Sequence, residues 1–152
     1  MDLRRITEIG VAVRDLEQAT SLLVDLFGAT ASGVTEVPQF GMRYRMCRLG
    51  KVDFELMEPT SEEGVIGRFL ARRGEGLHHI AFAVDDLDEA LAEWRGKEVR
   101  FVEPAPGELH LDFVDYAGRA FSDRVRFAFT EPRSVLGILF EFIQYPEGYQ
   151  TP

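Results

Sequence analysis

Two stretches of the chain alternate bulky apolar residues with small or polar ones over six positions. The first is Glu-Ile-Gly-Val-Ala-Val at residues 8–13, and the second is His-Ile-Ala-Phe-Ala-Val at residues 79–84. A period of two is typical of a strand that turns one face to a core. Each stretch leads through an Asp-Leu pair into apolar residues at helical spacing, so the pattern predicts a strand and then a helix in both places.

The expected helices have recognisable ends. Asp15 and Asp86 are the predicted N-caps, because a carboxylate there accepts from free N–H groups of the first turn. Gly28 is expected to end the first helix in a left-handed turn. One apolar face is predicted for that helix, made of Leu16, Ala19, Leu22, Leu23 and Leu26.

These segments belong to an internal repeat. Residues 8–19 recur as residues 79–90, at a constant offset of 71. Each copy also ends alike, in a strand-like apolar run with one internal acid, at Glu55 and at Glu141, which are 86 apart. The second copy is therefore longer by 15 residues, and we expect the excess in the turn-rich stretch from Val102 to Ser122.

The length and the repeat predict one domain over residues 1–152. Module one is expected at about 6–59 and module two at about 77–146. A linker helix is expected between them, at about 60–75, because Thr60-Ser-Glu-Glu63 has the spacing of a capping box.

Strand alternation places four candidate ligands at equivalent positions. In the first strand of each copy, the face opposite to the bulky residues carries one candidate ligand and two small residues. Small side chains leave the space that a cavity needs. If the phenylalanines of the closing strands face the helices, the acids of those strands turn to the same concavity. The four candidates are Glu8, Glu55, His79 and Glu141.

Charges buried so close together are costly unless a cation lies among them. Carboxylates with one imidazole suit a divalent metal ion, namely Mn, Mg, Co, Ni or Zn. Taken singly, each acid also fits an ion-paired or solvated side chain, and the imidazole fits a hydrogen-bonded core residue. His78 is expected on the opposite face, and His110 either lines the site or lies on the surface.

Charge and cysteine content exclude some classes of partner. Lys and Arg number 17 against 26 Asp and Glu, a net charge of −9, which repels nucleic acid and anionic membranes. Cys47 is the single cysteine, so no disulfide forms within the chain, and its apolar surroundings favour an inert thiol. Residues 1–14 have the pattern of neither a signal peptide nor a membrane span, so a cytoplasmic location is expected.

Three motifs carry a family resemblance: Gly76-Leu-His-His-Ile-Ala-Phe-Ala-Val-Asp-Asp-Leu87, Phe54-Glu-Leu-Met-Glu-Pro59 and Gly137-Ile-Leu-Phe-Glu-Phe-Ile-Gln144. They resemble the vicinal oxygen chelate (glyoxalase/bleomycin resistance/extradiol dioxygenase) superfamily, and within it the methylmalonyl-CoA epimerases, from about Ile6 to Pro146. The resemblance implies an α+β fold in which two tandem βαβββ modules form a cupped mixed sheet around a central metal cavity. It also implies that the four candidates are the metal ligands.

The activity that the resemblance implies is a 1,1-proton shift beside a carbonyl. Glu141 would be the base, and Tyr44 would be an acid if its side chain turns inward, although it also fits an ordinary strand aromatic. Two positions depart from the family: Glu8 stands where epimerases have His, and residues 41–47 contain no acid to act as a second base.

A small-molecule substrate is expected, with a CoA thioester as the form that the resemblance implies. Arg133 occupies the position of a basic residue in the epimerases, and Arg124 or Arg126 could assist, although internal ion pairs explain these arginines as well. Two other functions stay open: a glyoxalase I-like lyase acting on a hemithioacetal, and a non-enzymatic binder of the resistance type. Relatives commonly form homodimers, so a dimer is a further alternative.

Overall fold

The computed structural model describes residue 3, residues 6–115 and residues 117–149. The outermost residues of the expected domain, 1–2, 4–5 and 150–152, lie outside the described part. The chain divides into two compact units. Of the described residues, one unit takes Glu8–His78, and the other takes those of His79–Pro152 together with those of Met1–Thr7.

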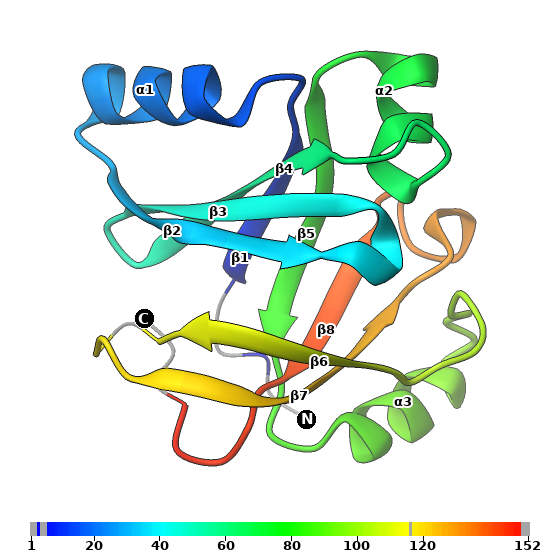
Figure 1. Cartoon of the computed structure of the whole chain (residues 1–152). Coiled ribbons are helices and arrows are strands. Elements are labelled where there is room, and N and C mark those ends of the chain that lie inside the picture. Colours follow the sequence, from blue (N-terminus) through cyan, green and yellow to red (C-terminus); the bar gives the residue numbers. More distant parts are fainter. Residues whose placement is uncertain (1–2, 4–5, 116, 150–152) are drawn as a thin grey trace. The chain divides into compact units, whose positions relative to one another are not determined.

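The Glu8–His78 unit contains the first βαβββ module and the linker helix (Figure 1). Its sheet has the strand order β2-β3-β4-β1, in which β1 and β4 are parallel and the other neighbours are antiparallel. A short 3-10 turn, Pro38–Phe40, joins β2 to β3. The elements are β1 Ile6–Ala12, α1 Leu16–Phe27, β2 Thr30–Val37, β3 Met42–Leu49, β4 Val52–Pro59 and α2 Val65–Arg73.

The second unit repeats this arrangement. Its strand order is β5-β8-β7-β6, with β5 and β8 parallel and the other neighbours antiparallel. The elements are β5 Gly76–Ala83, α3 Leu87–Arg95, β6 Gly107–Val114, β7 Ala120–Phe129 and β8 Phe140–Gln144. Both halves are therefore βαβββ modules with the same strand order and mixed pairing, which confirms the predicted fold class.

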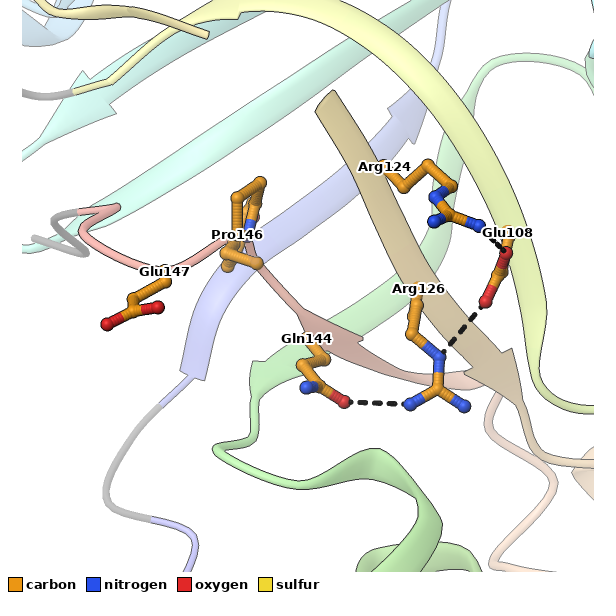
Figure 2. Close-up of a pocket in the computed structure, with 7 residues that line it drawn as sticks. Glu108, Arg124, Arg126, Gln144, Pro146 and Glu147 are labelled. Atoms are coloured by element: carbon orange, nitrogen blue, oxygen red, sulfur yellow. Dashed lines mark hydrogen bonds and ion pairs between the residues drawn. The ribbon is translucent and has the colours of Figure 1, made fainter. Parts of the chain in front are cut away.

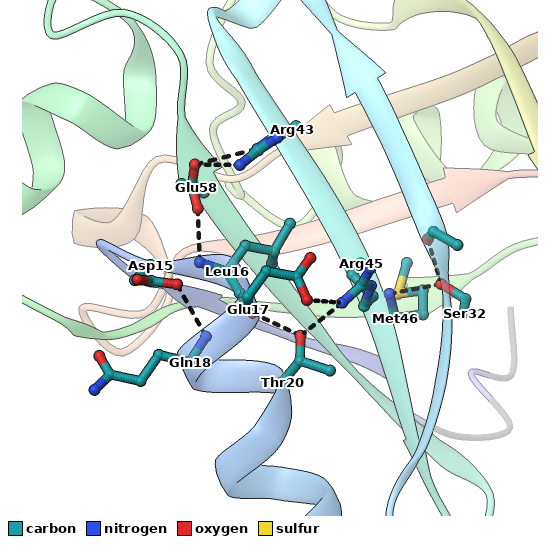
Figure 3. A network of polar contacts seen from close by, with 11 residues as sticks. Asp15, Leu16, Glu17, Gln18, Thr20, Ser32, Arg43, Arg45, Met46 and Glu58 are labelled. Carbon is teal, nitrogen blue, oxygen red and sulfur yellow. Dashed lines mark hydrogen bonds and ion pairs between the residues drawn. The ribbon is translucent and has the colours of Figure 1, made fainter.

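The predicted helix ends are confirmed. The carboxylates of Asp15 and Asp86 each accept a 2.9 Å hydrogen bond from the backbone N–H three residues later. Figure 3 shows the first of these caps, from Asp15 to Gln18. Gly28 follows α1 with φ 68°, a left-handed conformation that costs glycine little.

The predicted face of α1 is only partly right. Leu16, Ala19 and Leu23 pack toward Val11, Val13, Phe54 and Leu56, as expected. Leu22 and Leu26, however, are 54% and 68% exposed. The buried stripe passes instead through Thr20, whose hydroxyl donates to the Leu16 carbonyl over 2.6 Å. This polar residue can lie on the buried face of α1 because its hydroxyl is hydrogen bonded within the helix.

In the second module the bulky strand faces pack on α3, as predicted. Phe82, Phe140 and Phe142 lie with Leu87, Leu91 and Trp94 in one apolar cluster. The ring centroids of Trp94 and Phe142 are 4.0 Å apart. Since Phe140 and Phe142 face the helix, alternation turns Glu141 to the other face of β8.

The capping-box prediction for the linker helix is wrong. Helix α2 begins only at Val65, its N-cap is Gly64, and no side chain caps it. The Ser61 hydroxyl accepts from the Glu63 N–H in a turn before the helix. Glycine at position 64 is required by a close approach, because a Cβ there would lie 2.6 Å from the Phe40 carbonyl oxygen. The turn packs against the preceding chain, and the helix therefore begins later in the sequence than the capping box predicted.

The excess of the second copy lies only partly in the predicted stretch, of which residues 102–106 belong to a long connection. Most of the stretch from Val102 to Ser122 consists of β6 and the start of β7, which pair as a hairpin around Gly118. The extra residues lie in the connections 96–106 and 130–139, whose counterparts in module one are 28–29 and 50–51. Proline and glycine mark where these strands begin and turn, and they do not show which connection is long.

Candidate metal centre

Module one brings two of the predicted ligands to one face of its sheet. Glu8 lies on β1 and Glu55 on the adjacent parallel strand β4, where Gly10 is the register partner of Glu55. The two residues are only 3% and 8% exposed. Val11 and Val13 pack into the helix-side core, so alternation places Glu8 on the opposite face, as predicted.

A third buried carboxylate lies in the same module and was missed by the sequence analysis. Asp53 is 0% exposed and is the register partner of Glu8. Its spacing from Glu55 places both side chains on one face of β4, and this alternation could have identified it. Burial raises the pKa of Asp53, and the guanidinium of Arg48, 3.3 Å from Oδ1, lowers it by less.

Module two brings the other two predicted ligands into direct contact. Nε2 of His79, on β5, lies 3.0 Å from Oε2 of Glu141, on β8. Their side chains are 3% and 12% exposed. The register repeats that of module one, since Ala81 pairs with Glu141 as Gly10 pairs with Glu55. The His79 ring also meets Phe129 edge to face, at 5.7 Å between centroids, which fixes its orientation.

Tyr44 lies on the same face of its sheet as Glu55. It is the register partner of Met57, just as Met46 is the partner of Glu55. Directly opposed residues of an antiparallel pair share a face, and Met57 shares that of Glu55 by alternation. The side chain is half-buried. Tyr44 therefore shares the Glu55 face of its sheet, and its role as an acid stays a prediction.

The remaining candidates lie elsewhere. The His78 ring packs against Phe69 of α2, at 4.9 Å between centroids. His110 is exposed on β6, with Nε2 3.0 Å from the Ser122 hydroxyl, so it is a surface residue. Cys47 is fully buried, and burial raises the pKa of its thiol, which suits the inert role that was predicted.

The three candidate phosphate-binding arginines differ in their partners. Arg133 is exposed on the 3-10 turn η2, Pro132–Ser134, and has no ion pair within the described chain. Arg126 is held by Asp88, at 2.8 Å, and Arg124 by Glu108, at 3.4 Å. The internal ion pairs considered for Arg124 and Arg126 are therefore present.

Arg124 and Arg126 also line a polar cavity of about 380 Å³ (Figure 2). Arg126 is the register partner of Gln144, which alternation places on the face of β8 opposite to Glu141. The cavity therefore lies behind the strand that carries Glu141. Its lining residues are Glu108, Arg124, Arg126, Gln144, Tyr145, Pro146 and Glu147.

The donors in the two modules are carboxylate oxygens and one imidazole nitrogen, with no thiolate among them. This set suits hard or borderline divalent cations. In the described part of the chain, no helix is long and apolar enough to cross a membrane.

Comparison with known proteins agrees with the fold. Residues 7–114 match the family model described as Glyoxalase/Bleomycin resistance protein/Dioxygenase superfamily. A hypothetical protein from Bacillus halodurans has a similar structure, with a TM-score of 0.80 and 29% identity over 96% of this chain and 97% of that one. A variant methylmalonyl-CoA epimerase from Streptomyces coelicolor, in complex with 2-nitronate-propionyl-CoA, gives a TM-score of 0.76 and 31% identity over 94% of this chain and 98% of that one.

A mitochondrial methylmalonyl-CoA epimerase from Mus musculus is 33% identical over 99 residues. That match spans 64% of this chain and only 56% of the mouse protein. Enzymes that epimerise CoA thioesters are thus among the relatives of this chain in both sequence and structure. The chain belongs to the glyoxalase/bleomycin resistance protein/dioxygenase superfamily, among relatives that include the methylmalonyl-CoA epimerases.

Proposed function

We propose that this protein is a metal-dependent epimerase that moves a proton on a carbon beside a carbonyl, with a methylmalonyl-CoA-like thioester as substrate. The two modules would act as one domain with one site. Glu8, Glu55, His79 and Glu141 would hold one divalent metal ion between them. The observation that carries the proposal is the buried contact of 3.0 Å between His79 and Glu141, in a chain whose relatives include epimerases.

The chemistry of the donors supports the metal. Three carboxylates and one imidazole are a set of donors that could hold a divalent metal ion. Burying the charged form of carboxylates such as Glu8 and Glu55 is costly, and positive charge close by offsets that cost. Arg48 lies beside Asp53, which is a neighbour of both on the same face. A divalent cation would add positive charge for all of these carboxylates.

Glu141 is the base in this proposal. Its side chain is partly exposed, whereas His79 beside it is almost fully buried, so the carboxylate is the more accessible of the two. A carboxylate that is held at one oxygen can take the α-proton with the other and return it. The metal, when bound, would act as a Lewis acid that polarises the substrate carbonyl.

Tyr44 is the proposed acid on the other side of the substrate. Residues 41–47 contain no carboxylate, and Tyr44 is the residue of β3 with a transferable proton on the Glu55 face. A phenol hydroxyl carries a proton that it can donate. Loss of the Tyr44 hydroxyl should therefore slow return of the proton to one face of the carbon.

Recognition of CoA is the finer part of the proposal. The Streptomyces coelicolor relative binds a propionyl-CoA analogue. Arg133 is exposed and has no ion pair with the described residues, so its guanidinium is available for a phosphate. Arg124 and Arg126 already have carboxylate partners and are weaker candidates.

The test is hydrogen exchange at the α-carbon. Protein loaded in turn with Mn, Co, Ni, Zn and Mg would be incubated with methylmalonyl-CoA in D₂O, and deuterium incorporation would be followed by NMR. We expect exchange that depends on stoichiometric metal and stops with a chelator. Turnover of a glutathione hemithioacetal without α-exchange would point to a lyase, and purified protein that binds no divalent metal would point to a non-enzymatic binder.

A further inference from the structure

A group of arginines that form no ion pair with the described residues surrounds α2, in a chain of net charge −9. Arg68, Arg72 and Arg73 are all exposed on this nine-residue helix. None of these three guanidinium groups has a carboxylate within ion-pair distance in the described chain, although Glu62, Glu63 and Glu75 flank the helix in sequence. The nearby Glu75 carboxylate accepts a 2.8 Å hydrogen bond from the backbone N–H of Arg14, not from an arginine side chain.

Comparison with the other arginines shows how unusual this is. Among the described residues, eight arginines have a carboxylate within ion-pair distance. Five have none, and four of those five lie on α2 or at its end. The fourth is Arg14, whose Nη2 lies 3.9 Å from the point where a Cβ of Gly74 would be. The loop after β1 thus brings another guanidinium to the C-terminus of α2.

The helix dipole explains only part of the patch. Arg72 and Arg73 stand in the last turn, where positive charge is favourable. Arg68 stands four residues before Arg72, and like charges at this spacing repel each other. Arg73 lies over the Phe69 ring, at 5.8 Å from its centroid, which orients its guanidinium. The patch therefore carries repulsion that an anionic ligand would relieve.

We propose that Arg14, Arg68, Arg72 and Arg73 form a phosphate-binding site for the nucleotide end of the substrate, a CoA thioester. This inference rests on the proposed function. CoA carries a 3′-phosphate and a diphosphate, more negative charge than Arg133 alone can pair. Guanidinium groups bind phosphate through paired, charge-assisted hydrogen bonds. A few arginines suit a small polyphosphate, whereas the net charge disfavours an extended polyanion.

Calorimetric titration of the metal-loaded full chain tests the site directly. The probes are CoA, 3′-dephospho-CoA and adenosine 3′,5′-bisphosphate. The variant Arg68→Gln/Arg72→Gln is compared with Lys51→Gln/Lys97→Gln, which removes the same charge from two exposed lysines. We expect the arginine variant to bind CoA about tenfold or more weakly, because each lost guanidinium removes charge-assisted bonds. The lysine variant should bind CoA within about twofold of the parent, since exposed charges outside the proposed site contribute little to binding.

Outcomes separate this inference from the proposed function. If the arginine variant also loses the parent's preference for CoA over 3′-dephospho-CoA, the site is supported. If that variant binds all three probes as the parent does, the phosphates lie elsewhere and the inference is wrong, while CoA use stands. If the parent binds metal but no CoA probe, both the inference and the CoA part of the proposed function are wrong. Circular dichroism of each variant checks that it is folded.

Discussion

The backbone N–H of Leu16 donates a 2.6 Å hydrogen bond to Oε2 of Glu58, which ties the start of α1 to the end of β4 (Figure 3). The second module repeats the contact, since the N–H of Leu87 donates to Oε1 of Gln144 over 3.0 Å. In both cases a side chain of the closing strand satisfies a backbone N–H that no helical carbonyl can reach. Both modules therefore have the same hydrogen bond from the closing strand to the start of the helix, although the accepting residue changes from an acid to an amide.

Removal of the hydrogen bond between Leu16 and Glu58 should destabilise module one. Glu58 also accepts from Arg43, at 2.9 Å, so Glu58→Ala leaves both a helix N–H and a guanidinium without their acceptor. We expect a loss of about 1–3 kcal/mol of unfolding free energy, measured by urea denaturation. Glu58→Gln keeps an acceptor oxygen, as module two does, and should lose less than Glu58→Ala. Equal losses for the two substitutions would contradict this account.

Substitution at the His79–Glu141 contact should separate metal binding from proton transfer. His79→Ala removes the single imidazole ligand, and we expect bound metal to fall well below stoichiometry in elemental analysis. Glu141→Gln keeps an oxygen donor but cannot take a proton, so metal should remain. Its α-proton exchange should fall by about 10²–10⁴-fold, the usual contribution of a general base. Exchange at the parental rate in Glu141→Gln would assign the base to another residue.

Glu8 is the position at which this chain departs from the epimerase pattern. A carboxylate there lowers the net charge of the proposed site and weakens the Lewis acidity of a bound metal. We expect Glu8→His to raise the exchange rate of metal-loaded protein by about tenfold, which corresponds to ~1.4 kcal/mol of barrier. Glu8→Gln, also neutral but an oxygen donor, separates the effect of charge from that of the imidazole. A slower Glu8→His enzyme with full metal occupancy would show that the carboxylate serves the reaction.

The contact between Asp88 and Arg126 predicts a dependence of stability on pH. A hydrogen bond from Arg126 lowers the pKa of Asp88 below its ordinary value. The unfolded chain therefore binds this proton at higher pH than the folded chain does. The stabilisation should be complete above about pH 5 and should disappear as the pH falls through the lowered pKa of the folded state.

Urea midpoints between pH 7 and pH 2 measure this effect. Asp88→Asn should lower the midpoint at pH 7 and leave it unchanged at the acid end of the series. Asp85→Asn is the matched control, because Asp85 is exposed nearby and has no ion pair in the described chain. A midpoint difference between the parent and Asp88→Asn that persists at the lowest pH would rule out the ion pair as its cause.

Local signals in the sequence determined the modules, the helix caps and the strand faces. The echo of residues 8–19 in residues 79–90 was sufficient for the repeat, and alternation was sufficient to place Glu141 on the face away from Phe140 and Phe142. These features were predictable because backbone sterics fix the periods of strand and helix, and a cap depends on residues three positions apart.

Only the tertiary structure decided what depends on partners distant in sequence. Packing of α1 on its sheet left Leu22 and Leu26 exposed and brought Thr20 into the core. The register of β8 against β5 set the 3.0 Å contact between His79 and Glu141, and that of β4 against β1 placed the buried Asp53 beside Glu8. Alternation along a strand gives the face of a side chain, whereas its neighbours on that face follow from strand register and packing between elements far apart in the chain.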